Sequence, residues 1–320
     1  MKVKIMVYVS ALFLLGCGGE KPSGIISRPA GLTGRDAEKM EAKVLSKETE
    51  QAARITSGDY YDSCPSWSPD GGKIAYASYR EGMQNLWMVE VTAGEDGIVS
   101  SGEPVRITVG DFIDESPSWT PDGEKIVFSS NRNENPGLFV VNLSDKKVFD
   151  LQLEGISPKC ASVNKRFTFV YMNNIWTARL SEKKFQRYVT DSGYNGFPCW
   201  AGDEGEIVFS SGGDLIMINR DGSERVPLTS TGWNSHPDWC SEKEELVFVS
   251  NDEGNYDLWK MKLDGSGLVQ LTDGPGTEFL PAWSPDGKRI AFQADYKGSF
   301  DIWVIPVQGE TAESESEKEE

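Results

Sequence analysis

The chain has 320 residues and carries 50 acidic against 32 basic side chains, a formal net charge of −18. Phosphate binding needs Lys and Arg clustered on one face, and the sequence contains no such cluster, so nucleic acid is excluded as a partner. An acidic chain of this kind suits a basic partner, or simply solubility.

Residues 1–16 have the layout of a signal peptide. Lys2 and Lys4 precede an apolar run that ends at Cys17, and this run is too short to span a membrane. The ending resembles the bacterial lipobox, in which the cysteine becomes the lipidated first residue. The resemblance implies a lipid anchor at Cys17 and, because Gly18 rather than Asp follows, an outer-membrane position facing the periplasm. The alternative is a plain signal peptide with a chance cysteine.

Residues 17–51 are predicted to form the lipid anchor, a tether and a short helix. The segment begins rich in Gly, Pro and Ser and continues at 36–45 with a polar run of helical composition. Because its apolar residues are few, we expect a solvated spacer helix, and a helix that docks a partner is the alternative.

Six repeats fill the rest of the chain, each centred on a proline that is followed two residues later by tryptophan or by a degraded form of that pair. Successive prolines are 52, 41, 40, 39 and 44 residues apart, the period of four-stranded propeller blades. The runs between them are β-branched and aromatic and are bounded by Gly, Pro, Asn and Asp. The sequence therefore predicts an all-β fold, a six-bladed β-propeller of four-stranded blades. The six prolines are Pro65, Pro117, Pro158, Pro198, Pro237 and Pro281.

Three copies of a Ser/Thr-Pro-Asp-Gly motif, at 68–76, 120–128 and 284–292, carry a family resemblance. They look like the WD-like propeller repeat of TolB-type proteins, and the similarity covers about residues 52–307. The third repeat has neither the tryptophan nor the motif, and the fourth and fifth lose the motif. Some thirty residues lie between the predicted signal peptide and the repeats, fewer than the α/β domain of TolB itself would need.

Ring closure is predicted from a strand that the last repeat lacks. Earlier repeats end in segments such as Arg106-Ile107-Thr108, whereas the sixth runs into the acidic segment 308–320, which we expect to be disordered. A matching segment, Ala53-Arg54-Ile55-Thr56, lies before the first repeat. We expect it to supply the outer strand of the last blade and close the ring.

The candidate binding residues lie three residues before the repeat prolines, where five of six repeats have an oxygen-bearing side chain. In a propeller, these positions surround one mouth of the central channel. Two interpretations stay open: ligand binding at the mouth, and capping of a turn in each loop. The five residues are Asp62, Asp114, Asn195, Asn234 and Glu278.

Aromatic side chains precede three members of this set: Tyr61, Tyr194 and Trp233. Flat rings beside carboxylates suit basic side chains or sugar rings, and the acids would attract a cation or, less favourably, calcium. We expect no other cofactor, no catalytic residue and no metal site, and we expect a monomer. The favoured function is a non-catalytic module of the cell envelope that binds a protein or glycan, and the alternative is a carboxylate-dependent hydrolase or lyase acting on polysaccharide or peptide.

His236 is the only histidine, and no orienting partner for it can be named, so a structural role is favoured over a catalytic one. Cys64, Cys160, Cys199 and Cys240 have no metal-ligand spacing, and packed free thiols are expected. Cys199 and Cys240 share strand parity in adjacent blades and are the one pair for which a disulfide is considered. The recurring tryptophans and the Asp-Gly turns are assigned to structure.

Overall fold

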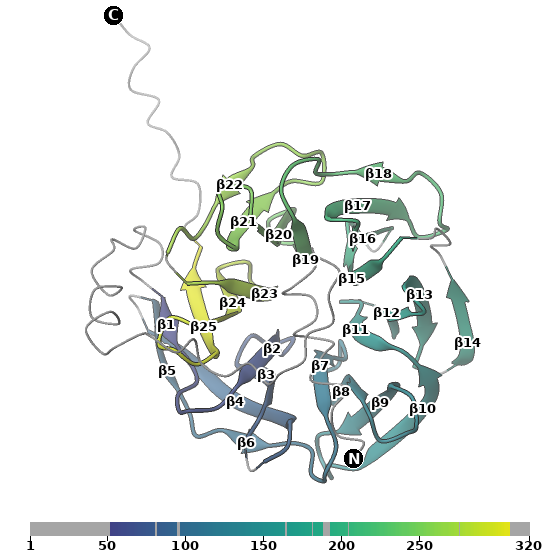
Figure 1. Ribbon diagram of the computed structural model, residues 1–320. Coiled ribbons are helices and arrows are strands. Elements are labelled where there is room, and N and C mark those ends of the chain that lie inside the picture. Colours follow the sequence, from purple (N-terminus) through teal and green to yellow (C-terminus); the bar gives the residue numbers. More distant parts are fainter. Residues whose placement is uncertain are drawn as a thin grey trace, which may run out of the picture. The chain divides into compact units, whose positions relative to one another are not determined.

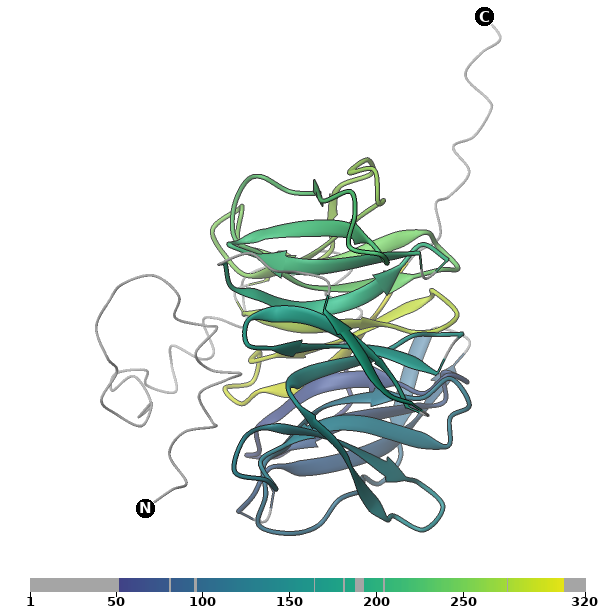
Figure 2. The same ribbon diagram turned by 90° about the vertical axis from the view of Figure 1, so that its right-hand side faces the viewer.

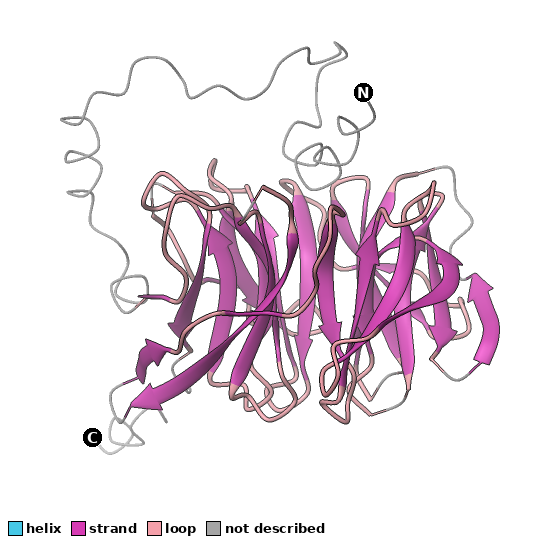
Figure 3. Ribbon diagram, turned by 90° about the horizontal axis from the view of Figure 1, so that it is seen from below, coloured by secondary structure: helices cyan, strands magenta, loops and turns pink. Residues whose placement is uncertain are grey.

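A computed structural model of the chain describes residues 52–307, apart from 81, 95–96, 164, 181, 188–192, 204 and 275. The described residues form strands and loops without helices, and the predicted signal peptide, anchor, tether and acidic tail lie outside them (Figure 3). No helix among them is long and apolar enough to cross a membrane.

Six antiparallel sheets surround a central axis, as the repeats predict (Figure 1). The first strand of each blade lies nearest the axis, and each of these inner strands contacts the inner strands of the two neighbouring blades. The inner strands, in blade order, are β2 (Asp62–Trp67), β7 (Asp114–Trp119), β11 (Ile156–Cys160), β15 (Asn195–Ala201), β19 (Asn234–Cys240) and β23 (Glu278–Trp283).

The second and third strands of each blade are hairpin partners with buried, β-branched and aromatic side chains, and all have five or six residues except the ten-residue β4. The second strands are β3 (Lys73–Ser78), β8 (Lys125–Ser130), β12 (Arg166–Tyr171), β16 (Glu206–Ser211), β20 (Glu245–Ser250) and β24 (Arg289–Ala294). The third strands are β4 (Asn85–Gly94), β9 (Gly137–Asn142), β13 (Asn174–Arg179), β17 (Asp214–Asn219), β21 (Asp257–Met261) and β25 (Asp301–Pro306).

The outer strands are mostly short. In blades 1 to 5 they are β6 (Val105–Arg106), β10 (Val148–Glu154), β14 (Glu182–Arg187), β18 (Val226–Pro227) and β22 (Val269–Gln270). Blade 1 also carries β5 (Gly97–Ser101), which pairs with the far end of β4. This extra hairpin explains why the first repeat is longer than the others.

The ring closes as predicted. In blade 6 the outer strand is β1 (Ala53–Arg54), which pairs with β25 through Ala53 opposite Val304 and Arg54 opposite Trp303. Ile55 is buried next to it, and the Thr56 hydroxyl accepts a hydrogen bond from the backbone N–H of Ile302 at 2.9 Å. The N-terminal segment thus satisfies backbone groups that an open edge would expose.

Apolar clusters fill the spaces between neighbouring blades. The cluster between blades 6 and 1, for example, packs Tyr76 and Ile74 of β3 against Ile302 and Val304 of β25. Two tryptophans add hydrogen bonds across the same spaces: Trp67 donates to the carbonyl of Ala282 at 3.1 Å, and Trp119 to that of Ser66 at 3.0 Å. The structural assignment of these two tryptophans is confirmed.

Loops gather on two opposite faces of the ring, as the side view shows (Figure 2). One face carries the loops that lead into the inner strands and is called here the mouth face. The opposite face carries the tight Asp-Gly turns, in which Asp70, Asp122 and Asp286 accept hydrogen bonds from the hydroxyl two residues before and the N–H two residues after. These aspartates have the structural role that the sequence predicts.

Candidate functional site

The five predicted binding residues each begin an inner strand, and their side chains are buried. Asp62 pairs with Arg80 at 3.2 Å. Asp114 accepts hydrogen bonds from the Ser130 hydroxyl at 2.6 Å and from Arg132 at 2.7 Å. Because arginines neutralise both carboxylates, Asp62 and Asp114 do not present free negative charges that would attract a cation.

The two amides act as caps of the loops beside them. Asn195 donates to the backbone carbonyl of Asn173 at 2.9 Å, and Asn234 donates to that of Thr231 at 2.6 Å. These are the contacts that the capping interpretation requires. A ligand-binding role for the five residues stays a prediction.

In blade 3 the corresponding position is Gly155, the member of the set without a polar side chain. Its φ is +149°, and a Cβ built there would lie 2.9 Å from the carbonyl oxygen of Val170 and 2.7 Å from the Phe169 ring. The backbone of β12 therefore passes too close for any side chain, which explains the gap in the pattern.

Glu278 differs from the other four residues because its neighbour is a second acid. Thr272 donates to one of its carboxylate oxygens at 3.1 Å, and Gln270 donates to Asp257 at 3.0 Å. Burial raises the pKa of Glu278 to about 8, with Asp257 adding to the shift and a hydrogen bond from Tyr296 opposing it. Burial also raises the pKa of Asp257. The two carboxyl groups therefore hold one proton between them at neutral pH.

The place where blade 6 meets blade 1 is called here the 6–1 junction. It brings together two acids at the positions equivalent to Asp257 and Glu278, but with arginine partners. Asp301 begins the third strand as Asp257 does, and it pairs with Arg54 at 2.6 Å. Burial raises the pKa of Asp301, and Arg54 opposes that shift. Asp62 and its partner Arg80 occupy the places that Glu278 and Tyr296 hold where blade 5 meets blade 6, called here the 5–6 junction.

The three predicted aromatic residues are half-buried in the loops of the mouth face. Tyr61 packs edge-on against Phe300, with 5.4 Å between ring centroids, and its hydroxyl accepts from Gln293 at 3.2 Å. Burial raises the pKa of Tyr61 to about 12 and also raises the pKa of Tyr194. The Trp233 ring lies over Gly213 of the preceding blade. These rings brace the loops and leave part of each surface exposed.

The axis of the ring is lined by a feature that sequence analysis missed. In all six inner strands the residue before the repeat proline has a left-handed φ of +50° to +55°, and the register shifts there by a bulge. This conformation is rare for residues other than glycine and is disfavoured before proline. In the sequence these residues can be found only as those that directly precede the repeat prolines: Cys64, Ser116, Ser157, Phe197, His236 and Leu280.

Contacts between these residues place them around one axis. The Cys64 sulfur lies 3.9 Å from the Ser116 hydroxyl, and the rings of Phe197 and His236 pack at a tilt of 37° with centroids 3.7 Å apart. One half of the lining is small and polar, and the other half is aromatic and aliphatic. His236 contacts Ser235 at 2.9 Å, and burial lowers its pKa to about 3, so its imidazole is neutral at physiological pH.

An ion pair between blades 3 and 5 crosses the axis. Lys159 of blade 3 contacts Asp238 of blade 5 at 2.7 Å, and Asp238 also accepts from the backbone N–H of Trp283 in blade 6 at 2.8 Å. Burial acts to lower the pKa of Lys159, but Asp238 more than offsets this and the pKa is raised. One carboxylate thus links three blades at this level of the axis.

The cysteines at 64, 160, 199 and 240 are free, so the considered disulfide between Cys199 and Cys240 is not formed. Cys199 packs in the apolar cluster between blades 4 and 5, whereas Cys240 lies against Gly287 of blade 6. Two side chains that point toward different neighbours cannot bridge. Across the described part of the chain, no group of three His, Cys, Asp or Glu residues could hold a metal ion.

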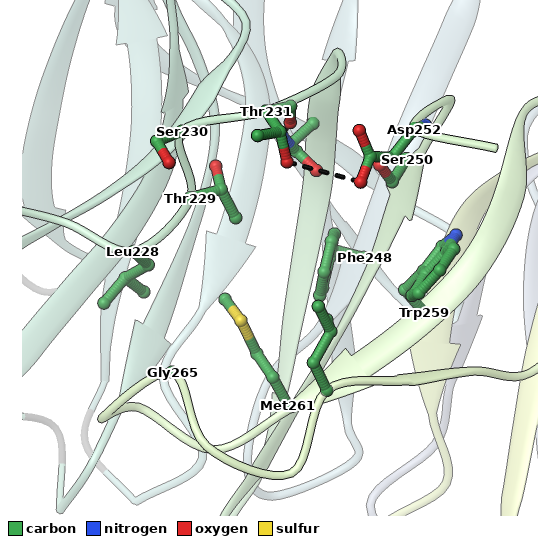
Figure 4. A pocket seen from close by; sticks show the side chains of 12 residues that line it. Leu228, Thr229, Ser230, Thr231, Phe248, Ser250, Asp252, Trp259, Met261 and Gly265 are labelled. Carbon is green, nitrogen blue, oxygen red and sulfur yellow. Dashed lines mark hydrogen bonds between the residues drawn. The ribbon is translucent and has the colours of Figure 1, made fainter. Parts of the chain in front are cut away.

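A cavity of about 180 Å³ lies between blades 4 and 5, beside the mouth face (Figure 4). Phe248, Trp259 and Met261 of blade 5 form its apolar wall. Exposed polar groups mark its upper edge, where Thr231 donates to Asp252 at 3.3 Å. The cavity is smaller than a typical drug-sized site and suits one side chain of a partner.

The fold and these sites define a six-bladed β-propeller with a polar and aromatic mouth face. The chain matches the family model described as the TolB beta propeller domain over residues 36–232 and 216–320, and it belongs to that family. The Tol-Pal system protein TolB of Francisella tularensis is 33% identical over 84 residues, 26% of this chain and 18% of that relative. The match therefore spans less than a fifth of the relative's length.

Solved structures of other propellers show the same fold. A putative TolB from Agrobacterium tumefaciens gives a TM-score of 0.61 at 18% identity, covering 81% of this chain and 97% of that one. An oligogalacturonate lyase from Vibrio parahaemolyticus gives 0.55 at 13% identity, covering 80% and 93%. At such identities the likeness concerns the fold alone.

Proposed function

We propose that this TolB-like propeller is a non-catalytic binding module of the bacterial envelope that docks a protein partner on its mouth face. One observation carries the proposal. Large apolar side chains are exposed on loops of this face, with 41% of Tyr60, 44% of Tyr79, 69% of Val109 and 72% of Met172 open to solvent. Exposed aromatic and aliphatic groups rimmed by polar residues are typical of protein docking surfaces.

The opposite face contrasts with this arrangement. Its described loops include short Asp-Gly turns whose side chains bond their own backbone, and two large apolar residues, Val163 and Leu268, are exposed in its loops. Because more of these groups lie on loops of the mouth face, the partner is expected there. The Francisella relative is a Tol-Pal system protein, which supports an envelope setting for this chain.

Photo-crosslinking tests the choice of face. We expect p-benzoyl-L-phenylalanine placed at Tyr79 or at Val109 to capture a protein from envelope extract on irradiation, and the same residue placed at Val163 to capture none. The three positions are all exposed, so differences in reach do not explain the contrast. Equal capture from Val163, or no capture from the mouth face, would contradict the proposal.

The lipid anchor at Cys17 belongs to the same proposal. Replacing Cys17 with Ala should release the protein from the membrane fraction or leave its signal uncleaved. Cys64→Ala is the matched control and should do neither, since Cys64 is buried at the axis. A processed, membrane-bound Cys17→Ala protein would rule the anchor out.

A further inference from the structure

Blade 1 contains a space that its own arginine fills, called here the arginine slot. Its walls are Tyr76 of the second strand and Trp87, which pairs with Tyr76 in the third. The Arg80 guanidinium lies 5.9 Å from the Tyr76 ring centroid, 5.1 Å from that of Trp87 and 4.7 Å from that of Tyr60. Asp62 supplies the countercharge.

Blade 2 repeats this arrangement with different aromatic residues. The Arg132 guanidinium lies 5.8 Å from the ring of Phe128, 6.0 Å from that of Phe139 and 4.6 Å from that of Phe112, and Asp114 is its countercharge. Arg80 and Arg132 both follow their repeat proline by fifteen residues. The slot is therefore a property of the repeat.

Two further blades fill the slot in other ways. In blade 4, Arg225 comes from the loop before the outer strand. Its guanidinium lies 5.8 Å from the Phe209 ring and donates to Ser211 at 3.1 Å. In blade 6, Tyr296 follows the repeat proline by fifteen residues, and its ring lies 5.0 Å from Trp303 and 6.2 Å from Phe292. A planar group therefore occupies the slot in each of these four blades.

Blade 5 keeps the walls of the slot but lacks the group that fills it. Phe248 pairs with Trp259 as Tyr76 pairs with Trp87, and Asn234 pairs with Ser250 as Asp62 pairs with Ser78. At the arginine position stands Asp252, and at the position of Tyr60 stands Gly232. The cavity of about 180 Å³ is the result, lined by Phe248, Trp259, Asn234, Ser250 and Asp252 (Figure 4).

We propose that this open slot binds the guanidinium group of an arginine side chain from a protein partner. The chemistry is that of the filled slots: aromatic walls to stack on, a serine and an amide to accept or orient hydrogen bonds, and a carboxylate as countercharge. In blade 5 the charges are reversed with respect to blade 1, since the acid takes the place of the arginine. An incoming cation would restore the pair that blades 1 and 2 form internally.

Arginine fits this site better than lysine does. A planar guanidinium stacks on aromatic rings and is weakly hydrated, whereas an ammonium group is a compact and strongly hydrated charge. The rim of the cavity is exposed at Ser230, Thr231 and Asp252, so a partner on the mouth face can reach it. The chain's net charge of −18 favours the approach of a basic partner.

The identity of the occupant rests on the proposed docking function, but the slot can be tested without any partner. The probe is N-acetyl-L-arginine amide, titrated onto the full-length chain by saturation-transfer NMR or calorimetry. N-acetyl-L-citrulline amide, which has the same shape without the charge, is its control. We expect the citrulline compound to bind about tenfold more weakly, because it loses the cation–π and ionic attraction.

Two variants of the chain complete the experiment. Asp252→Asn should weaken binding of the arginine compound about tenfold, and Asp252→Arg should abolish it, because the new side chain fills the slot as Arg80 does. Glu134→Arg, at an exposed position of the same face, makes the same charge change and should bind the probe as wild type does. Thermal unfolding checks that each variant folds, and Asp252→Asn carries the test if Asp252→Arg does not.

Equal binding of the two compounds by wild type would overturn the proposal that the open slot binds arginine. Wild-type affinity in Asp252→Arg would overturn it too. The outcome is separable from that of the docking proposal. Discriminating binding of the probe without crosslinking from Tyr79 would leave the slot standing and refute docking on the mouth face. Crosslinking from Tyr79 with equal binding of the two compounds would support docking on the mouth face and refute the arginine slot in blade 5.

Discussion

The 6–1 and 5–6 junctions each bury two acidic side chains in equivalent positions, but the negative charge is compensated differently in the two. Each brings together an acid that begins a third strand and an acid that begins the next inner strand. In the 6–1 junction Arg54 and Arg80 neutralise the acids. In the 5–6 junction the corresponding residues are Gln270 and Tyr296, so no arginine is present and the pair keeps a proton.

The comparison shows that the same backbone accepts an ion pair or a protonated acid. An unpaired buried charge costs several kcal/mol, so the group either finds a counter-ion or shifts its pKa. Which of the two occurs is decided by one or two side chains of the repeat. The two junctions should therefore respond differently to mutation.

The largest expected effect comes from removing the closing strand of the 6–1 junction. Deletion of residues 52–57 removes Arg54, leaves Asp301 buried without its partner and exposes the apolar surface that Ile55 covers. We expect a loss of about 5 kcal/mol in the free energy of unfolding. Urea denaturation followed by tryptophan fluorescence measures it, and a deletion variant as stable as the parent would exclude closure by this strand.

Removing one arginine while keeping its acid gives the next effect. Arg80→Met should destabilise the protein by about 3 kcal/mol at pH 7, because Asp62 is fully buried and loses its counter-ion. The double variant Asp62→Asn with Arg80→Met should recover much of this loss. If the double variant is no more stable than Arg80→Met in the same denaturation assay, the ion pair is not the source of the effect.

The 5–6 junction should lose stability as the pH rises. The pKa of Glu278 rises from the model-compound value of 4.5 to about 8 on folding, so folding favours the protonated form. Its contribution is complete below pH 4.5 and is lost as the pH rises through 8. Unfolding measured from pH 5 to pH 9 should show wild type losing about 2 to 4 kcal/mol relative to Glu278→Gln. Parallel pH profiles for the two proteins would contradict this.

The smallest effect is expected from removing the acidic C-terminal segment, which changes the total charge of the chain. Residues 310–320 hold six glutamates and one lysine. With almost no apolar side chain, they cannot offset the entropy of ordering. Truncation after Gly309 should change the free energy of unfolding by less than about 0.5 kcal/mol. A larger loss would show that total charge, rather than the local pairing of acids, matters.

The fold could be predicted from the sequence because the repeat period, the tryptophans and the displaced closing strand all indicate one ring. The candidate site was only partly predictable. Counting back from the repeat prolines located Asp62, Asp114 and Glu278 correctly at the mouth end of the inner strands. Their partners lie elsewhere in the repeat, at Arg80 and Arg132, and linking them requires the pairing of the first and second strands.

The lining of the axis could not be predicted for a different reason. The bulge before each proline shifts the register of the inner strand, so simple alternation assigns the wrong face to the residues around it. The contact of His236 with Phe197 at the axis therefore could not be read from the sequence. The open slot in blade 5 could not be predicted either, because it is recognised only by comparison with the side chains that fill the slot in the other blades.

The state of Glu278 is the most direct test of the comparison between the two junctions. A carbon-13 NMR titration of glutamate carboxyl groups, with the Glu278 signal identified by its loss in Glu278→Gln, reports that pKa in the folded protein. We predict a midpoint near 8 for Glu278, because burial and Asp257 both favour its protonated form. A midpoint near 4.5 would mean that the 5–6 junction carries an unprotonated acid pair and would contradict the account.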